Sequence, residues 1–149
     1  MTKYYEILQE LKNEINALGF FHTITQGDVS GIDVNKNNLY PLAHVVINNA
    51  NFQSQTIVFN VTILMMDQLK QSKEETTDNY RGNDNEIDVL NTMLTLQNRL
   101  YEVLRRRELI IQIEENTVSL NPFVMRYENG LAGWEMTINL VTYANMPIC

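Results

Sequence analysis

The segment Trp134-Glu135-Met136-Thr137-Ile138-Asn139-Leu140 alternates apolar and polar side chains along its whole length. Successive side chains of a strand point to opposite faces of the sheet, so this period of two predicts a strand with one buried and one polar face. The preceding dipeptide Asn129-Gly130 tolerates a positive φ at both residues and therefore predicts a hairpin. We expect this hairpin to pair residues 123–128 with residues 131–143.

Runs of β-branched and aromatic residues, bounded by turn residues, predict further strands upstream of this hairpin. These strands are expected at residues 20–25, 40–48, 56–66, 108–113 and 117–125. Pro41 has no N–H to donate, which confines it to the first residues of its strand or to a sheet edge. Residues 26–31 and 48–51 are rich in Gly, Asn and Asp and predict turns.

The strand expected at residues 56–66 is the longest one. One of its faces is apolar throughout and consists of Ile57, Phe59, Val61, Ile63 and Met65. The other face is polar at Asn60 and Thr62 but apolar at Leu64 and Met66. Because a strand that is apolar on both faces is buried on both faces, we expect a helix or another subunit to cover that end.

Apolar residues spaced three and four apart predict amphipathic helices over residues 2–18 and 86–106. The first helix has one stripe, formed by Tyr4, Leu8, Leu11, Ile15 and Leu18. Thr2 is expected to cap its start, and Gly19 to take the left-handed position that ends it. The second helix has two adjacent stripes, Ile87, Leu90, Leu94, Tyr101 and Leu104 beside Val89, Met93, Leu96, Leu100 and Val103. This apolar width exceeds what one sheet surface requires and indicates either an interface or further packing inside the domain.

These elements predict a single α+β domain over residues 1–149. Its sheet is mainly antiparallel, the N-terminal helix and the long second helix pack on one face, and a long polar loop at residues 67–85 lies between. A length of 149 residues with 44% hydrophobic and 19% charged residues is ordinary for one soluble globular domain. No run of about 18 apolar residues occurs, which excludes a transmembrane helix. The sole cysteine, Cys149, excludes an internal disulfide and fits a reducing compartment.

Motifs for catalysis, metal binding and phosphate binding are absent from the sequence. His22 and His44 are the only histidines, and we expect each to be hydrogen-bonded or partly exposed in a strand. The aspartates Asp28, Asp33, Asp84 and Asp88 do not have the spacing of a calcium loop. Cys149 has no base near it in sequence. We therefore expect no catalytic residue, no metal, no cofactor and no enzymatic activity.

The 67–85 loop carries almost no core-forming residues, and a connection this long is usually functional or disordered. It is either a solvated loop or a segment that orders against a neighbouring subunit. Arg105-Arg106-Arg107 likewise has three interpretations: favourable cations at a helix C-terminus, an anchor that pairs with acidic loop residues of a neighbour, or nucleic-acid binding. The candidate subunit interface comprises Glu74, Glu75, Asp78, Tyr80, Arg81, Arg105, Arg106 and Arg107.

The chain resembles the tail-completion and tail-terminator proteins of tailed bacteriophages. The resemblance rests on the order of elements over most of the chain, from the N-terminal helix to the long helix that ends near Leu104. More narrowly, it is similar to virion proteins of crAss-like phages that infect Bacteroidetes. The segments that carry this similarity are residues 27–33 (GDVSGID), 40–44 (YPLAH), 85–91 (NEIDVLN) and 130–134 (GLAGW).

The resemblance implies a structural virion protein that forms a ring of identical subunits, a hexamer or dodecamer, at the head–tail neck. Such a ring is assembled in the host cytoplasm and contacts other neck, portal or tail proteins, with no membrane involved. DNA would pass through the lumen without sequence-specific binding, and the net charge of −7 fits a lumen that does not hold phosphates. A small dimeric α+β binding or regulatory module is the alternative, and it predicts a concave apolar pocket.

Overall fold

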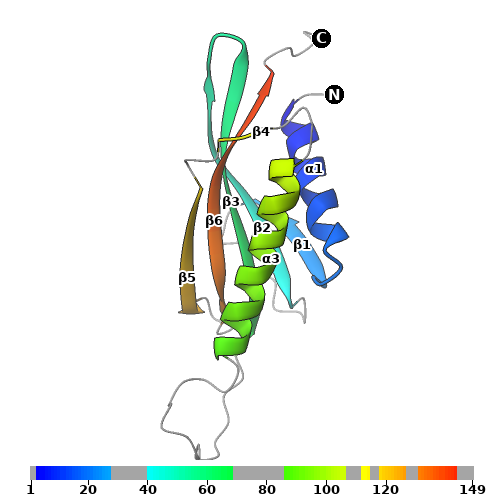
Figure 1. The fold of residues 1–149 in the computed structure, drawn as a ribbon, viewed down its shortest axis with the longest axis vertical. Helices are drawn as coiled ribbons and strands as arrows, with labels where there is room; N and C mark the ends of the chain where they lie inside the picture. Colours follow the sequence, from blue (N-terminus) through cyan, green and yellow to red (C-terminus); the bar gives the residue numbers. More distant parts are fainter. Residues whose placement is uncertain are drawn as a thin grey trace, which may run out of the picture.

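The computed structural model describes residues 3–27, 40–68, 86–106, 112–114, 118–126 and 131–143 (Figure 1). Its framework is a six-stranded sheet in the order β1-β2-β3-β6-β4, with β5 also paired to β6. The alternating segment lies in β6 (Leu131–Tyr143), which pairs antiparallel with β3 (Thr56–Gln68) over the full length of both strands. The opposite edge of β6 is shared by β5 (Ser119–Arg126) and the short β4 (Gln112–Ile113). The predicted antiparallel pairing of the last two long strands is thus confirmed, while residues 127–130 lie outside the described chain.

At the other side of the sheet, β2 (Leu42–Phe52) pairs antiparallel with β3, and β1 (Thr23–Gln26) pairs parallel with β2. The predicted strand at residues 20–25 therefore begins later, at Thr23, and its parallel pairing was not foreseen. The predicted turn at residues 48–51 is wrong, because β2 continues to Phe52 through a bulge at Asn48. Pairing with β3 overrides the turn preference of the asparagines in this segment.

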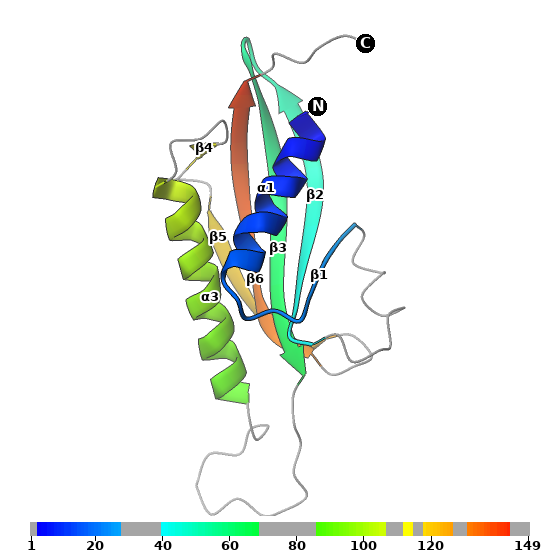
Figure 2. The same ribbon diagram turned by 90° about the vertical axis from the view of Figure 1, so that its right-hand side faces the viewer.

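Two helices cover one face of the sheet (Figure 2): α1 (Lys3–Ala17) and α3 (Glu86–Arg106). Both agree with the predicted ranges to within a residue or two, and Gly19 has a φ of 70°, as its left-handed stop position requires. Ile7, Leu8, Leu11 and Ile15 of α1 are buried, whereas Tyr4 is exposed and does not belong to the packed stripe. The α+β class with both helices on one face is confirmed.

The main core lies between these helices and the sheet. The odd-numbered face of β3 is buried in it, as predicted, together with Ala132, Met136, Ile138 and Leu140 of β6. Four residues of one α3 stripe pack into this core, namely Val89, Met93, Leu96 and Leu100, and the other stripe contributes Leu104 and the partly buried Tyr101. The face of α3 that carries Ile87 and Leu94 remains exposed. Part of the apolar width predicted for this helix is therefore exposed to solvent.

A second, smaller apolar cluster lies on the opposite sheet face and contains Leu42, Leu64, Met66, Phe123 and Leu131. Leu64 and Met66 are the residues for which a covering helix or second subunit was expected. No second subunit is required to bury them, because both side chains are buried within the single chain, and the described helices α1 and α3 lie on the other face. Strand residues that are distant in sequence, such as Phe123 and Leu131, complete this cluster.

Candidate functional site

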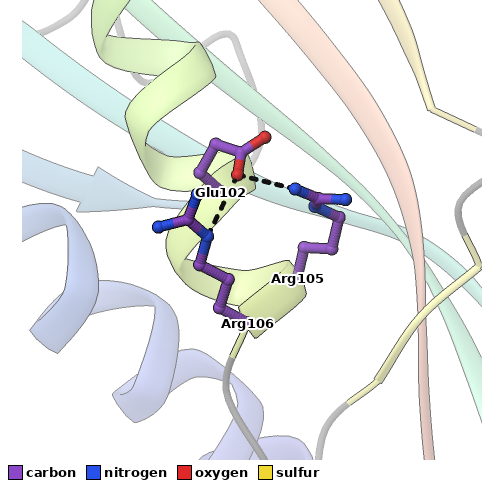
Figure 3. Close-up of polar contacts among 3 residues, drawn as sticks. All are labelled: Glu102, Arg105 and Arg106. Carbon is purple, nitrogen blue, oxygen red and sulfur yellow. Dashed lines mark hydrogen bonds and ion pairs between the residues drawn. The ribbon is translucent and has the colours of Figure 1, made fainter.

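The C-terminal end of α3 presents two of the three predicted arginines. Arg105 donates from a guanidinium nitrogen to Glu102 Oε2 at 2.8 Å, and Arg106 Nε lies 3.3 Å from the same oxygen (Figure 3). The hydrogen bond from Arg105, together with the charges of both arginines, holds the pKa of Glu102 below its usual value, although partial desolvation opposes the shift. Both guanidinium groups therefore already have a carboxylate partner on their own helix.

This arrangement agrees with the interpretation that the arginines stabilise the helix C-terminus. The interpretation as an anchor for an acidic loop of a neighbour stays a prediction. Its other members, Glu74, Glu75, Asp78, Tyr80, Arg81 and Arg107, lie outside the described residues.

The two histidines occupy unlike environments. His44 of β2 is buried, with Nδ1 2.6 Å from Thr25 Oγ1 and Nε2 3.0 Å from the carbonyl oxygen of Gly27. A neutral ring that donates from Nε2 and accepts the Thr25 hydroxyl at Nδ1 satisfies both contacts. His22 lies before β1, is exposed, and contacts Thr23 Oγ1 through Nδ1 at 3.0 Å. Among the described residues there is no group of three His, Cys, Asp or Glu side chains placed to hold a metal ion.

A groove of ≈ 630 Å³ runs between α3 and β5. Its main lining residues are Leu94, Gln97, Tyr101, Val118, Leu120 and Met136. Thr95 and Asn98 add polar side chains, and all of these lining residues are uncharged. Leu94 and Leu120, on the two walls, are 36% and 39% exposed, whereas Met136 is buried. Leu94 and Tyr101, from the α3 stripe that is less completely buried, thus line one wall of this largely apolar groove.

Gln97 is the unusual residue of this groove because its side chain is fully buried. Its Nε2 donates to the carbonyl oxygen of Ile63 on β3 at 2.8 Å and to that of Trp134 on β6 at 3.0 Å. Its Oε1 is buried and has no hydrogen-bond partner within the described structure. Trp134 also links β6 to α3, because Nε1 of its indole donates to the carbonyl oxygen of Leu90 at 2.9 Å. These contacts fix the position of α3 along the sheet.

The β2–β3 hairpin extends past the ends of both helices (Figures 1 and 2). Residues 48–55 at its end are all exposed, and none of them is charged. Phe52 is 78% exposed, a large value for an aromatic side chain. The hairpin stays ordered to its tip, where Phe52 is paired with Ile57 and the Gln53 amide donates to the carbonyl oxygen of Thr56 at 2.8 Å.

A ladder of polar side chains crosses the sheet face opposite the helices. Asn48 donates to Asn60 Oδ1 at 2.9 Å and to Thr62 Oγ1 at 2.7 Å. Asn60 donates to Asn139 Oδ1 at 2.8 Å, and Asn139 donates to Glu114 Oε2 at 3.2 Å. The ladder thus links β2, β3 and β6 through side chains that are neutral except for Glu114. No lysine or arginine takes part in these contacts of the described strands.

Three of these features were missed from the sequence: the exposed tip at Phe52, the buried Gln97 and the wall contributed by Leu120. The sequence does contain a signal for the exposed tip, because one aromatic residue stands among polar ones in the run Asn51-Phe52-Gln53-Ser54. No local pattern marks Gln97, because its partners Ile63 and Trp134 are remote in sequence.

Comparison with models of protein families, with curated proteins and with solved structures gives no match. Neither of the described helices is long and apolar enough to span a membrane.

Proposed function

We propose that this chain is a structural virion protein of a tailed phage, which forms a ring of identical subunits at the head–tail neck. In such a ring each subunit uses two different patches, one for each neighbour. The observation that carries the proposal is the pair of uncharged surfaces, each with exposed apolar side chains, on distant parts of one chain. These patches are the hairpin tip at Phe52 and the groove lined by Leu94 and Leu120.

Two further features support this role. The order of helices and strands on which the phage resemblance rests is present in the fold, including the long strand β3 and the long helix α3. The sheet face opposite the helices carries a ladder of polar side chains that includes Asn60, Asn139 and Glu114. The net charge of −7 is compatible with a lumen through which DNA slides without phosphate contacts. The proposed role is structural and requires no catalysis.

The mass of the purified protein in solution tests the proposal. Light scattering at several protein and salt concentrations is expected to reveal a closed oligomer of six or twelve subunits, alone or after mixing with a portal or tail component. A protein that stays monomeric in both situations would overturn the ring. The loop predicted at residues 67–85 belongs to the same proposal, as a contact to a neighbour or to the lumen. Its first two residues continue β3 to Gln68, and residues 69–85 lie outside the described chain.

The groove between α3 and β5 favours one alternative, a small dimeric α+β binding or regulatory module. Its lining is largely apolar and includes Gln97, whose Oε1 acceptor is buried without a partner in the described structure, which suits a ligand that donates a hydrogen bond. This alternative predicts a dimer whose mass does not increase with protein concentration.

A further inference from the structure

We propose that Phe52, at the tip of the β2–β3 hairpin, inserts into the groove between α3 and β5 of a second copy of this chain. The inference rests on the proposed self-assembly and names the contact that holds neighbouring subunits together. It assigns an occupant to the groove and a binding partner to the exposed aromatic ring.

The β2–β3 hairpin holds the aromatic ring of Phe52 in an exposed position. Phe52 is 78% exposed, although β2 and β3 remain paired up to Phe52 and Ile57. Two hydrogen bonds between Gln53 and Thr56 close the tip, at 2.8 Å between backbone atoms and 3.3 Å between side chains. β6 supports the hairpin from its other side, since Thr56 is paired with Tyr143. A preorganised knob of this kind loses little conformational entropy when it binds.

The groove is suited to an aromatic ring with uncharged neighbours. Leu94 and Leu120 form exposed apolar walls, and Met136 at the floor supplies a sulfur atom that packs favourably against aromatic rings. A volume of ≈ 630 Å³ is enough for the ring and for parts of the flanking residues. The Asn98 amide at the groove matches the Gln53 side-chain amide, because both groups donate and accept hydrogen bonds.

Charge also favours this contact over others. The chain carries a net charge of −7, so two copies repel each other overall. Residues 48–55 at the tip and the residues that line the groove are all uncharged. Contact between these two patches therefore buries apolar surface without bringing like charges together.

The strand registers exclude insertion of the tip into the groove of its own chain. Phe52 lies at the level of Ile57 of β3, whereas the groove residue Leu120 pairs with Met136, which pairs with Ile63. The levels of Ile57 and Ile63 are about 20 Å apart, at about 3.3 Å per strand residue. The hairpin also points away from β5 in both views of the fold. The contact must therefore join two chains. It is made once in each direction in a two-fold dimer, or in one direction only, which closes a ring or extends a filament.

Cross-linking between two single-cysteine variants tests this contact directly. Gln53→Cys and Asn98→Cys are made separately with Cys149→Ser, mixed at high protein concentration and oxidised mildly. We expect a disulfide-linked heterodimer in the mixture, and at least a fivefold lower yield when Asn13→Cys on the exposed side of α1 replaces Asn98→Cys. Absence of the mixed product, or a larger yield of Gln53→Cys linked to itself, would overturn the proposal.

A second measurement separates this contact from the ring itself. Phe52→Ser and Leu94→Ser are expected to reduce the mass in solution to that of the monomer, with an unchanged circular dichroism spectrum. Gln55→Ser, at the same tip, is the matched control and should keep the oligomer. A closed oligomer that persists in Phe52→Ser would overturn the contact and leave the ring proposal standing. Mixed cross-links in a protein that forms only open chains would support the contact and overturn the ring.

Discussion

Gly133 lies on β6 in close contact with the backbone of β3. A Cβ atom built at this residue would overlap the carbonyl oxygen of Met65 and crowd the Cα atom of Met66, and both are backbone atoms that cannot rotate away. We expect Gly133→Ala to lower the free energy of unfolding by about 3 kcal/mol, the upper end of the range for overpacked cores. Urea denaturation followed by circular dichroism measures the loss.

Gly19→Ala is the matched control for this substitution. Gly19 has a φ of 70° and open space around it, so its Cβ adds backbone strain of about 1–2 kcal/mol without a clash. A loss at Gly19 equal to or larger than that at Gly133 would contradict the close approach of β6 and β3.

The stability of the C-terminal end of α3 is expected to depend on pH through the Glu102 carboxylate. The hydrogen bond from Arg105 and the charges of both arginines lower its pKa in the folded chain, so its contribution to stability is present above the unfolded pKa. That contribution disappears as the pH falls through the folded pKa. NMR titration is expected to show a pKa below the usual value for Glu102, which moves upward in Arg105→Gln. An unchanged pKa in that variant would contradict the interaction.

At the scale of elements, Gln97 connects α3 to two strands at once. Gln97→Glu keeps the shape of the side chain but removes both donors to the carbonyl oxygens of Ile63 and Trp134. A buried carboxylate without a partner is expected to lower the free energy of unfolding by about 3–5 kcal/mol at neutral pH. Because burial raises its folded pKa, the loss is smallest below the unfolded pKa of about 4 and grows as the pH rises.

Asn98→Asp supplies the matched control, since the neighbouring residue on α3 is exposed. Its effect on chemical denaturation is expected to stay within about 0.5 kcal/mol at every pH. Equal losses for the two variants would show that Gln97 does not hold α3 on the sheet.

Leucine-to-alanine substitutions, one in each stripe of α3, distinguish a side chain buried on the sheet from one exposed at the groove. Leu100 is fully buried against the sheet, whereas Leu94 is 36% exposed at the groove. We expect Leu100→Ala to lower the free energy of unfolding by about 2–5 kcal/mol, because it leaves a cavity in the core. Leu94→Ala is expected to lower it by less than about 1 kcal/mol in the monomer. The reverse order, measured by thermal or urea unfolding, would mean that the other stripe packs on the sheet.

At the scale of the whole molecule, we expect a deletion in the long loop to prevent assembly without preventing folding. Residues 70–82 belong to the connection between β3 and α3 and lie outside the described chain. Their deletion is expected to abolish ring formation or head–tail joining, because the loop contacts a neighbour or the lumen, and to leave the monomer folded. Light scattering measures the first effect and circular dichroism the second. Unchanged assembly of the deletion variant would remove this loop from the proposed interface.

The sequence by itself determined the elements whose signals are local. β3 and β6 follow from alternation along Thr56–Gln68 and Leu131–Tyr143, and α3 follows from its apolar spacing over Glu86–Arg106. Gly19 marks the end of α1 because a left-handed residue there favours glycine. These signals suffice because hydrophobic periodicity and backbone preference act between residues a few positions apart.

Only the tertiary structure decided how these elements combine. It pairs β1 parallel to β2, extends β2 through the predicted turn to Phe52, and chooses the stripe of α3 that packs on the sheet. It also creates the groove by bringing Leu94 of α3 beside Leu120 of β5. Each of these outcomes depends on contacts between segments far apart in the chain, whose free energy no local pattern contains. The exposed surfaces proposed for assembly are therefore the part of the molecule that pattern alone predicts least.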